Sequence, residues 1–417
     1  VIYQEFNLVP GLSARENIFL GQEAARAGFI AVDEERRRVR ELFDRLGAKI
    51  DPETRCAELS VAEQQEVEIA KALARDARLI VMDEPSSSLS PTEVARLLSV
   101  VRELTAQGIG VIYISHRLDE IFEIADRVTV LRDGGLVGTQ PIGEFTRESM
   151  IEMMVGRKLD QEFPKVTAEI GEERLVVTGL CRRRRVREVS FSIRRGEVLG
   201  LTGLVGAGRT ETARLIFGAD TREAGTITLD GKSLPLHSPR EAVAAGICLL
   251  PEDRKAQGLV LGQSVRENFG LPNLATFSRL GFVDAKREAE ALDSHVDKLQ
   301  IKLSSTDQSA GTLSGGNQQK VVLAKWLERS AEVIIFDEPT RGIDVGAKYE
   351  IYQLINRLAA AGKAILMISS ELPEVLGMSD RILVMHEGRI TGEITDVAGA
   401  TQSDLMRLAV GQTEMAA

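Results

Sequence analysis

The chain contains one series of short motifs twice, in the same order and at a constant separation. LSVAEQQ begins at Leu59 and LSGGNQQ at Leu313, which is 254 residues later. MDEP and FDEP place aspartates at 83 and 337, and ADRV and SDRI place aspartates at 126 and 380, so both pairs keep the 254-residue offset. The register holds without a gap for roughly 75 residues, which makes chance a poor explanation. The sequence therefore predicts two copies of one domain.

The repeat stops short on the N-terminal side of the first copy. REN at 15–17 pairs with REN at 266–268, an offset of 251, and VIYQE at the start pairs with CLLPE at 248–252. Residues 174–247 have no counterpart in the first half. We therefore expect the first copy to lack roughly its first 75 residues, including its own glycine loop.

Short apolar runs alternate with helical segments in both copies. LIVMDE and VIIFDE are apolar runs that end in two acids, a pattern typical of a buried parallel strand with an exposed carboxyl end. GVIYIS and AILMIS are further expected strands, and they follow helices expected at 93–106 and 347–361. Alternating strands and helices predict an α/β fold. The polar segment 157–173, which contains Pro164, is the predicted linker between a first domain, 1–156, and a second, 174–417.

Composition narrows the class of protein. A length of 417 residues allows two or three domains, and 43% apolar and 27% charged residues are ordinary for a globular protein. A net charge of −10 argues against a general nucleic-acid binder. No apolar run approaches the roughly 18 residues that cross a bilayer. Cys56, Cys181 and Cys248 have no metal-ligand or disulfide spacing, which favours a reduced, cytosolic compartment.

GLVGAGRT at 203–210 matches the phosphate-loop pattern G-x-x-x-x-G-K-[ST], except that Arg209 replaces the lysine. The surrounding sequence predicts a strand, a glycine loop and a helix, whose backbone N–H groups and N-terminus bind phosphates. Thr210 stands where a hydroxyl would ligate Mg²⁺, whereas a planar guanidinium cannot replace a compact ammonium without a shift in position. Considered alone, the loop fits a structural glycine turn equally well. The predicted nucleotide contacts are Gly203, Gly206, Ala207, Gly208, Arg209 and Thr210.

An aspartate–glutamate pair ends the matching apolar strand of each copy. In a P-loop NTPase the strand-terminal aspartate, here Asp83 or Asp337, holds Mg²⁺, partly through water. The glutamate that follows, Glu84 or Glu338, can polarise the attacking water as a general base. A single DEP commonly just begins a helix, but two of them after matching strands favour a catalytic role.

LSGGNQQKVVLAKWL at 313–327 is the most specific stretch of the chain, and with it the sequence resembles the ATP-binding-cassette family, whose signature motif it carries. The resemblance implies that Ser314, Gly315 and Gly316 meet the γ-phosphate of an ATP bound by the opposite copy, and that Gln318 belongs to the same nucleotide site. The alternative is a serine-capped amphipathic helix. The 24 residues from Ser314 to Glu338 agree with the spacing of the family.

The first copy departs from the signature but keeps another residue of the family. It retains Ser60, whereas Val61 and Ala62 replace the two glycines and would crowd a phosphate. His116 follows its strand at the place where the family has a histidine that touches the γ-phosphate, and the second copy has Ser370 there.

Gln4 resembles the family's Q-loop glutamine, which reports Mg²⁺–ATP to the membrane partner. The resemblance implies that it contacts both the nucleotide and the metal. In the second copy this region reads LLPEDRKAQG, and Pro251 and Glu252 align near the glutamine.

The resemblance further implies two unequal sites, each built from the phosphate loop of one copy and the signature of the other. The first would combine the missing loop with Gln4, Asp83, Glu84, His116, Ser314, Gly315 and Gly316. The second would combine GLVGAGRT, Asp337 and Glu338 with the altered signature at 60–62. Every departure falls in the second site. We therefore expect the first site to hydrolyse ATP and the second to bind nucleotide with little turnover.

MVGRKLDQEFP, PEDRK, GLVGAGRTE, DEPTRGIDVGAK and ISSELPE narrow the resemblance to the ATP-binding subunit of bacterial monosaccharide importers of the ribose, xylose and galactose type. It implies two tandem P-loop NTPase domains, each with a RecA-like core and a helical subdomain, and ATP and Mg²⁺ as cofactors. Such a subunit lies on the cytoplasmic face of the plasma membrane, peripheral to transmembrane permease subunits. A periplasmic sugar-binding protein is an indirect partner, and no nucleic acid is expected.

Two other functions stay open on the sequence. One is a soluble cassette ATPase acting on ribosomes or nucleic acid, for which CRRRRVRE at 181–188 is the only pointer; a solvated hairpin is the favoured interpretation of that stretch. The other is a regulatory module that binds ATP without hydrolysing it. Glu84, Glu338 and His116 argue against that module, because a pure binder has little need of a water-activating base.

Overall fold

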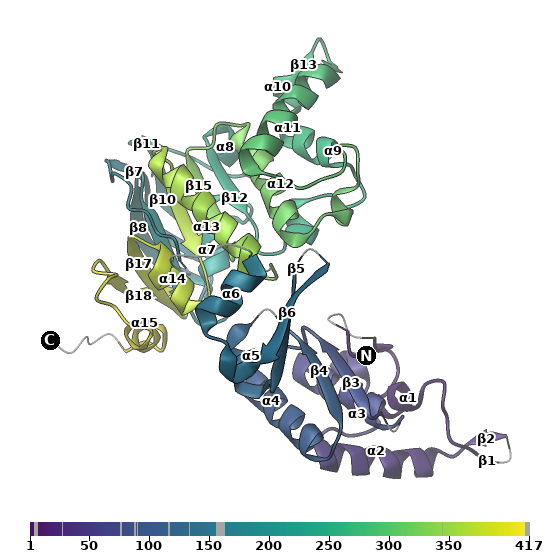
Figure 1. Cartoon of the computed structure of the whole chain (residues 1–417). Coiled ribbons are helices and arrows are strands. Elements are labelled where there is room, and N and C mark those ends of the chain that lie inside the picture. Colours follow the sequence, from purple (N-terminus) through teal and green to yellow (C-terminus); the bar gives the residue numbers. More distant parts are fainter. Residues whose placement is uncertain are drawn as a thin grey trace. The chain divides into compact units, whose positions relative to one another are not determined.

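The chain divides into two units, Val1–Lys158 and Leu159–Ala417 (Figure 1). The computed structural model describes residues 1–3, 7–26, 28–75, 77–86, 89, 91–115, 117–132, 134–155, 163–343 and 345–412. Of the predicted linker, 157–162 lie outside the described residues. The part that follows packs on the second unit, where the Phe163 ring lies 5.6 Å from that of Tyr352 and Lys165 forms an ion pair of 2.9 Å with Asp380.

A six-stranded sheet forms the centre of the second unit, with strand order β12-β15-β16-β9-β17-β18. Its first five strands are parallel, and only β18 runs antiparallel to its neighbour. The carboxyl ends of the parallel strands therefore share one edge. The bounds are β12 (Ile247–Leu250), β15 (Val333–Asp337), β16 (Ala364–Ile368), β9 (Val198–Gly203), β17 (Arg381–His386) and β18 (Arg389–Ile394).

An antiparallel sheet and several helices complete the core of this unit. The antiparallel sheet has the order β11-β10-β7-β8, with β11 (Lys232–Ser233), β10 (Ala224–Leu229), β7 (Glu173–Arg182) and β8 (Val186–Arg194). The helices are α7 (Arg209–Ile216), α8 (Pro239–Ala244), α13 (Val345–Ala360), α14 (Leu372–Met378) and α15 (Gln402–Ala409).

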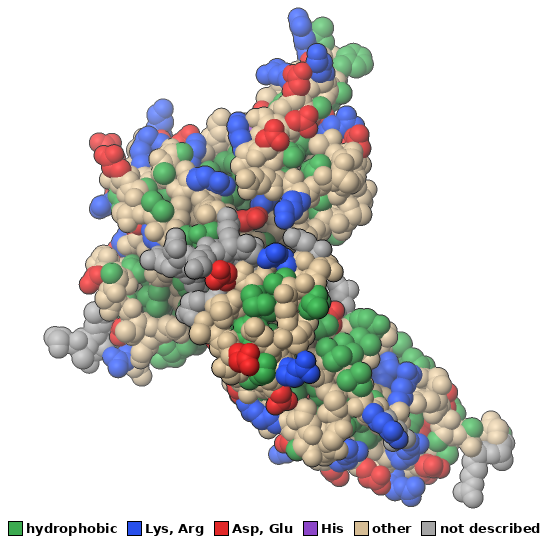
Figure 2. Space-filling view, viewed as in Figure 1, with side chains coloured by type: hydrophobic (Ala, Val, Ile, Leu, Met, Phe, Trp, Pro, Cys, Tyr) green, Lys and Arg blue, Asp and Glu red, His purple; other side chains and the backbone are tan. Residues whose placement is uncertain are grey.

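A helical part follows β12 in the chain. It contains the π-helix η3 (Arg254–Gly258), α9 (Val265–Gly270), the 3₁₀ turn η4 (Leu271–Asn273), α10 (Leu274–Phe277), α11 (Ala285–Leu299), the 3₁₀ turn η5 (Ala310–Thr312) and α12 (Gly315–Leu327). A two-residue hairpin of β13 (Ser278–Arg279) and β14 (Phe282–Val283) projects from it, with Leu280 93% and Phe282 80% exposed. Hydrophobic and basic side chains lie together at this tip (Figure 2).

Side chains of the parallel strands alternate between two cores. Leu199, Leu201 and Leu366 pack on the side of the antiparallel sheet and α7. Ile365 and Met367 point to the opposite face, toward α12 and α13. Because both faces are covered, these strands read as continuous apolar runs in the sequence.

The described part of the first unit has three separate strand pairs. β3 (Leu79–Asp83) and β4 (Gly110–Ile114) are parallel, and β5 (Arg127–Arg132) and β6 (Gly135–Pro141) are antiparallel. A small hairpin joins β1 (Ala25–Arg26) to β2 (Phe29–Ile30). The helices are α1 (Ala14–Phe19), α2 (Val32–Leu46), α3 (Val61–Leu73), α4 (Pro91–Ala106), α5 (Leu118–Ile124) and α6 (Arg147–Val155), with 3₁₀ turns η1 (Cys56–Glu58) and η2 (Ile142–Glu144).

The 254-residue offset maps the strands of the first unit onto those of the second. β3, β4, β5 and β6 correspond to β15, β16, β17 and β18, and the pairings within them are the same. Ile2 bridges Met82 in the parallel sense, as β12 pairs with β15. Within the described part of the first unit, nothing corresponds to β9. No helix in the described chain is long and apolar enough to cross a membrane.

Candidate functional site

The glycine loop connects the central strand β9 to α7. Gly203 and Gly208 have φ values of 151° and 102°, in the region that favours glycine. A Cβ on Gly203 would collide with the carbonyl oxygen of Met385, and a Cβ on Gly208 with that of Arg185. Glycine is therefore required at both positions by backbone conformation and by close packing. The loop ends with N–H groups gathered at the start of α7, the arrangement that binds phosphates.

Thr210 lies in the first turn of α7 and contacts the end of β15. Its hydroxyl donates to Asp337 Oδ1 at 3.2 Å. Asp337 is 2% exposed, and burial raises the pKa of its carboxyl to about 6. A buried carboxylate beside a hydroxyl supplies the hard oxygen donors that Mg²⁺ prefers, and a bound cation would offset the loss of hydration. The two residues therefore fit the predicted metal site.

Arg209 pairs with the glutamate that follows Asp337. Its Nη1 lies 3.1 Å from Glu338 Oε1, and both side chains are about 10% exposed. The other carboxylate oxygen, Oε2, accepts a hydrogen bond of 3.1 Å from the hydroxyl of Ser370. Each carboxylate oxygen of Glu338 thus already accepts one hydrogen bond from a side chain. Each oxygen has a second lone pair, so Glu338 can still accept a hydrogen bond from a water while both contacts are in place.

This pairing was not predicted from the sequence. Arg209 and Glu338 are 129 residues apart, and each was assigned its own role. The available signal was their position: the loop and the acid pair occupy neighbouring ends of parallel strands, so a longer, forked side chain in the loop would reach the acids.

The signature segment places Ser314 at the N-cap position of α12. Its side chain makes no capping hydrogen bond, and its hydroxyl accepts instead from Asn317 Nδ2 at 2.9 Å. Because this capping hydrogen bond is not made, the first N–H groups of α12 lack the usual serine cap. The Ser314 side chain is exposed. A Cβ on Gly316 would come within 2.8 Å of the Ala347 Cβ. Gln318 is 3% exposed and donates to the carbonyl of Ala310 at 3.2 Å.

Comparison with known proteins places these features in a family. The sequence model of the family described as "ABC transporter" matches residues 1–87 and 186–341.

The chain belongs to the ABC transporter family.

Two relatives share half of their residues with it along nearly its whole length. Ribose import ATP-binding protein RbsA 2 of Streptomyces avermitilis is 51% identical over 413 residues, covering 99% of this chain and 82% of the relative. Ribose import ATP-binding protein RbsA of Chromobacterium violaceum is 48% identical over 412 residues, covering 99% and 82%.

A solved structure supports the fold. A nucleotide-free ATP-binding cassette from an ABC transporter aligns with a TM-score of 0.50 at 21% identity, covering 58% of this chain and all of that one. The likeness shows the α/β fold of an ATP-binding cassette.

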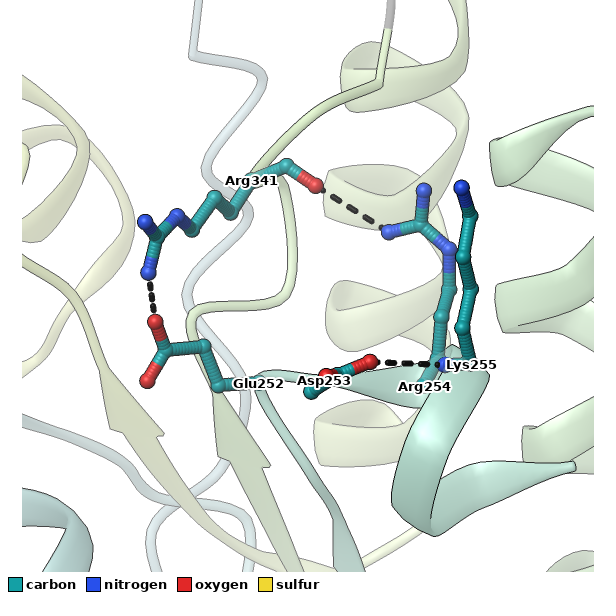
Figure 3. A pocket seen from close by; sticks show the side chains of 5 residues that line it. All are labelled: Glu252, Asp253, Arg254, Lys255 and Arg341. Carbon is teal, nitrogen blue, oxygen red and sulfur yellow. Dashed lines mark hydrogen bonds and ion pairs between the residues drawn. The ribbon is translucent and has the colours of Figure 1, made fainter. Parts of the chain in front are cut away.

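A charged cavity lies at the segment PEDRK, residues 251–255. It has a volume of about 400 Å³ and is lined by Glu252, Asp253, Arg254, Lys255 and Arg341 (Figure 3). Glu252 and Arg341 form an ion pair across it. Asp253 caps η3 by accepting from two backbone N–H groups at 3.0 Å.

Arg254 lies between this cavity and the signature segment, LSGGNQQ, of the chain. Its guanidinium donates to the carbonyls of Arg341 at 3.1 Å and Gly342 at 3.2 Å. A Cβ on Gly315 would collide with Arg254 Nη2. Gly315 therefore leaves the space that the guanidinium occupies, a role that sequence spacing alone did not reveal.

The first unit repeats the acid pair in the same backbone geometry. Glu84 and Glu338 have φ values of 46° and 49°, and their N–H groups donate to the equivalent carbonyls of Ile114 and Ile368, both at 2.9 Å. Left-handed φ is uncommon outside glycine and clusters at functional sites. Asp83 ends β3 as Asp337 ends β15. Gln4 and His116 lie outside the described residues.

Ser60 differs from Ser314 in what its hydroxyl does. It caps α3, accepting from the Glu63 N–H at 3.3 Å, while Glu63 Oε2 accepts from the Ser60 N–H at 2.8 Å. This reciprocal capping box uses the groups that a signature serine would offer to a phosphate. Val61, in place of the first glycine, is 39% exposed.

Proposed function

We propose that the chain is the ATP-binding and ATP-hydrolysing subunit of an importer for a monosaccharide such as ribose. The observation that carries the proposal is the 3.2 Å contact between Thr210 and Asp337, which joins the glycine loop to a strand-terminal acid. The substrate class rests on relatives named ribose import ATP-binding proteins, about half identical along nearly the whole chain. The alternative, a soluble cassette ATPase acting on ribosomes or nucleic acid, receives no support from these relatives.

We propose further that the chain holds two tandem cassettes, 1–156 and 174–417, joined by 157–173, each with a RecA-like core and a helical subdomain. Support comes from the matching strand pairs at the 254-residue offset and from the matching strained glutamates Glu84 and Glu338.

At the second cassette we assign ATP to the glycine loop. The N–H groups from Gly206 to Thr210 would bind phosphate oxygens, and the Thr210 hydroxyl and Asp337 carboxylate would hold Mg²⁺. The metal would supply positive charge that neutralises the phosphates. Arg209 keeps a positive charge at the loop, but its guanidinium pairs with Glu338, the residue in the position of the general base. We therefore propose that this site retains nucleotide with little hydrolysis.

The hydrolytic roles are assigned to the first cassette and to the intact signature. Glu84 is proposed as the general base and Asp83 as a metal ligand. Ser314, Gly315 and Gly316 are proposed to receive a phosphate at the uncapped start of α12. The assignments of Gln4 and His116 rest on the sequence resemblance.

The partners follow from the same proposal. Transmembrane permease subunits would receive the motion that ATP binding drives, with this chain peripheral on the cytoplasmic face of the membrane. A periplasmic sugar-binding protein would act on the permease from the other side.

Equilibrium binding of ATP with and without Mg²⁺ tests the assignment of the glycine loop. We expect binding that requires Mg²⁺ and is lost in Thr210→Ala, because the variant removes a hydroxyl ligand. Thr178→Ala, an exposed threonine of β7, is the matched control and should bind as the wild type does. Trp326, the single tryptophan, reports whether the second unit is folded. A folded chain that binds no ATP would overturn the assignment.

A further inference from the structure

The hairpin of β13 and β14 carries apolar side chains at its surface. Leu280 is 93% exposed, Phe282 80% and Val283 45%. The hairpin lies between α10 and α11, on the side away from the six-stranded sheet of its unit (Figure 1). Single exposed apolar residues are common on protein surfaces, so exposure alone assigns no role. This tip differs from such residues in its backbone and in its repetition.

The backbone of the turn disfavours the leucine at its tip. Arg279 and Phe282 are direct cross-strand partners, which leaves a two-residue turn of Leu280 and Gly281. Their φ values are 52° and 85°, and hairpin turns with two positive φ values strongly favour the pair asparagine–glycine. Leucine adopts this region only with strain. The chain therefore places an apolar side chain at the most exposed part of the turn against the preference of the backbone, which points to a role for that side chain.

The first unit has the same hairpin. Its strands β1 and β2 pair Arg26 with Phe29, and these residues lie 253 positions before the cross-strand pair of Arg279 and Phe282. Phe29 is 80% exposed, as Phe282 is. Both copies of the repeat thus keep an exposed phenylalanine opposite an arginine in the register of a short hairpin. Incidental exposure does not explain the same feature at two equivalent positions.

The charged side chains nearest the second hairpin are mainly cations. Arg279 stands directly opposite Phe282, and in the part of the chain that the structure describes no carboxylate lies within ion-pair distance of it. The side chain of Lys286, in the first turn of α11, is 86% exposed and reaches Glu290 only at 3.9 Å. The carboxylate of Asp284 caps α11, where it accepts from a backbone N–H at 3.1 Å. The tip therefore presents cations beside an apolar centre (Figure 2).

Apolar side chains flanked by cations suit the interface of an anionic lipid membrane. Phenyl rings and leucine side chains bury area at the boundary of the acyl chains, while guanidinium and ammonium groups stay at the level of the phosphates. The net charge of −10 opposes attraction of the whole chain to such a membrane, so contact requires a local basic site.

The shape of the tip also favours lipid over a protein partner. A stable protein interface buries about 800 Å² on each partner, which is more than a projecting turn of a few residues offers. A fluid lipid surface accepts such a tip without a preformed groove.

We propose that the tip of β13 and β14 inserts Leu280 and Phe282 into the interface of an anionic lipid membrane, with Arg279 contacting lipid phosphates. The equivalent hairpin of β1 and β2 would do the same through Phe29. The chain would then contact lipid directly, in addition to the permease proposed as its partner. The inference goes beyond the proposed ATP-dependent function, and it can fail while Mg²⁺-dependent ATP binding stands.

Flotation with vesicles of phosphatidylcholine and phosphatidylglycerol, in a ratio of about 2:1, tests the proposal. The reference is the whole chain with Phe29→Thr, so that the first hairpin does not mask a loss at the second. Leu280→Asn should weaken vesicle binding about fivefold, because it removes apolar area from the tip. Asparagine suits the left-handed φ, so the turn should be kept. Arg279→Gln should weaken binding by a similar factor, and high salt should remove that difference.

Two matched controls remove the same groups elsewhere. Leu136 is 68% exposed in β6 of the first unit, and Arg240 is exposed in α8 of the second. Leu136→Asn and Arg240→Gln should each change vesicle binding less than about twofold. A loss in Leu136→Asn equal to that in Leu280→Asn would mean that any exposed apolar surface binds lipid, and would overturn the proposal. Binding to native membranes but not to vesicles of pure lipid would also overturn it, in favour of a protein partner.

Phe282→Trp places a fluorescent reporter at the tip. We expect its emission to shift to shorter wavelength when the anionic vesicles are added, because the indole leaves water. The emission of the wild type comes from Trp326 alone and should not shift. Vesicle binding without a shift in the variant would show that another part of the chain contacts the lipid, and would refute the assignment of the tip.

Discussion

Strands β4 and β16 occupy the same position of the repeat in very different surroundings. Ile112 and Ile114 of β4 are 49% and 46% exposed, whereas the equivalent Leu366 and Ile368 of β16 are fully buried. In the second unit β9 pairs with both β16 and β17. In the described part of the first unit, β4 pairs only with β3, and hydrophobic side chains lie at the surface around β4, β5 and β6 (Figure 2).

The difference separates what a strand's own sequence determines from what its neighbours determine. GVIYIS and AILMIS both form parallel strands beside an acid-ended partner, so local apolar pattern and β-branched residues suffice for the strand. Burial requires a further strand and the sheet that covers it. The two units thus provide an internal comparison between two strands of the same pairing that differ in how they are covered.

The largest expected effect contrasts alanine substitutions at the two equivalent strand positions. Leu366→Ala should lower the free energy of unfolding of the second unit by about 3 kcal/mol, because it leaves a cavity in a closed core. Ile112→Ala should cost less than about 1 kcal/mol, because half of that side chain is already in water. Urea unfolding followed by Trp326 fluorescence measures the first, and hydrogen exchange of β3 and β4 amides measures the second. Similar losses would show that β4 is covered in solution.

The next effect tests the ion pair at Arg209, for which the first unit has no described equivalent. Arg209→Met should destabilise the second unit by about 2–3 kcal/mol, because it leaves the buried Glu338 carboxylate without its cation. The double variant with Glu338→Gln should recover most of this loss. Urea unfolding of the two single variants and the double variant gives the coupling energy. Strictly additive losses would contradict the pairing.

A smaller effect is expected for the pH dependence of stability at two buried glutamates in equivalent positions, Glu374 and Glu120. Glu374 accepts from the Thr340 hydroxyl at 2.7 Å, and burial raises the pKa of its carboxyl from about 4.5 to about 6. The folded chain thus holds the proton of Glu374 more tightly than the unfolded chain does. Protonated Glu374 therefore contributes stability that is fully present below pH 4.5 and is lost as the pH rises through about 6. The loss amounts to about 2 kcal/mol. Glu374→Gln should therefore gain about 2 kcal/mol relative to wild type between pH 4.5 and 7.5, as measured by urea unfolding.

Glu120 provides the matched control for this pH effect. It forms an ion pair of 3.0 Å with Arg117 and accepts from the hydroxyls of Ser86 at 2.7 Å and Tyr113 at 2.8 Å. At the position equivalent to Arg117 the second unit has Glu371. Glu120→Gln should therefore destabilise the first unit near neutral pH, because it removes the carboxylate that pairs with Arg117. At the same pH, Glu374→Gln should be more stable relative to the wild type than it is at pH 4.5. The same pH trend in both variants would remove the distinction between the sites.

The sequence alone predicted the parts of the site that depend on spacing along the chain. The strands, their acid ends and the glycine loop follow from apolar runs and from the 254-residue offset. The contacts between distant segments did not follow. Such contacts depend on how side chains from different layers approach one another, and the periodicity of the sequence holds no information on this. Examples are the Arg209–Glu338 pair, the Arg254 guanidinium beside Gly315, and the cavity beside the glycine loop that arginines line.

The smallest expected effect compares the serines at the starts of α3 and α12. Ser60→Ala should lower the stability of α3 by about 1 kcal/mol, because it removes the hydroxyl of a capping box. Ser314→Ala should change the stability of the second unit by less than about 0.5 kcal/mol, since its hydroxyl makes no cap. Hydrogen exchange of the first-turn amides of α3, and Trp326-monitored urea unfolding for α12, measure the two. An equal loss at Ser314 would mean that this serine caps its helix in solution, which would weaken its assignment as a phosphate-binding group.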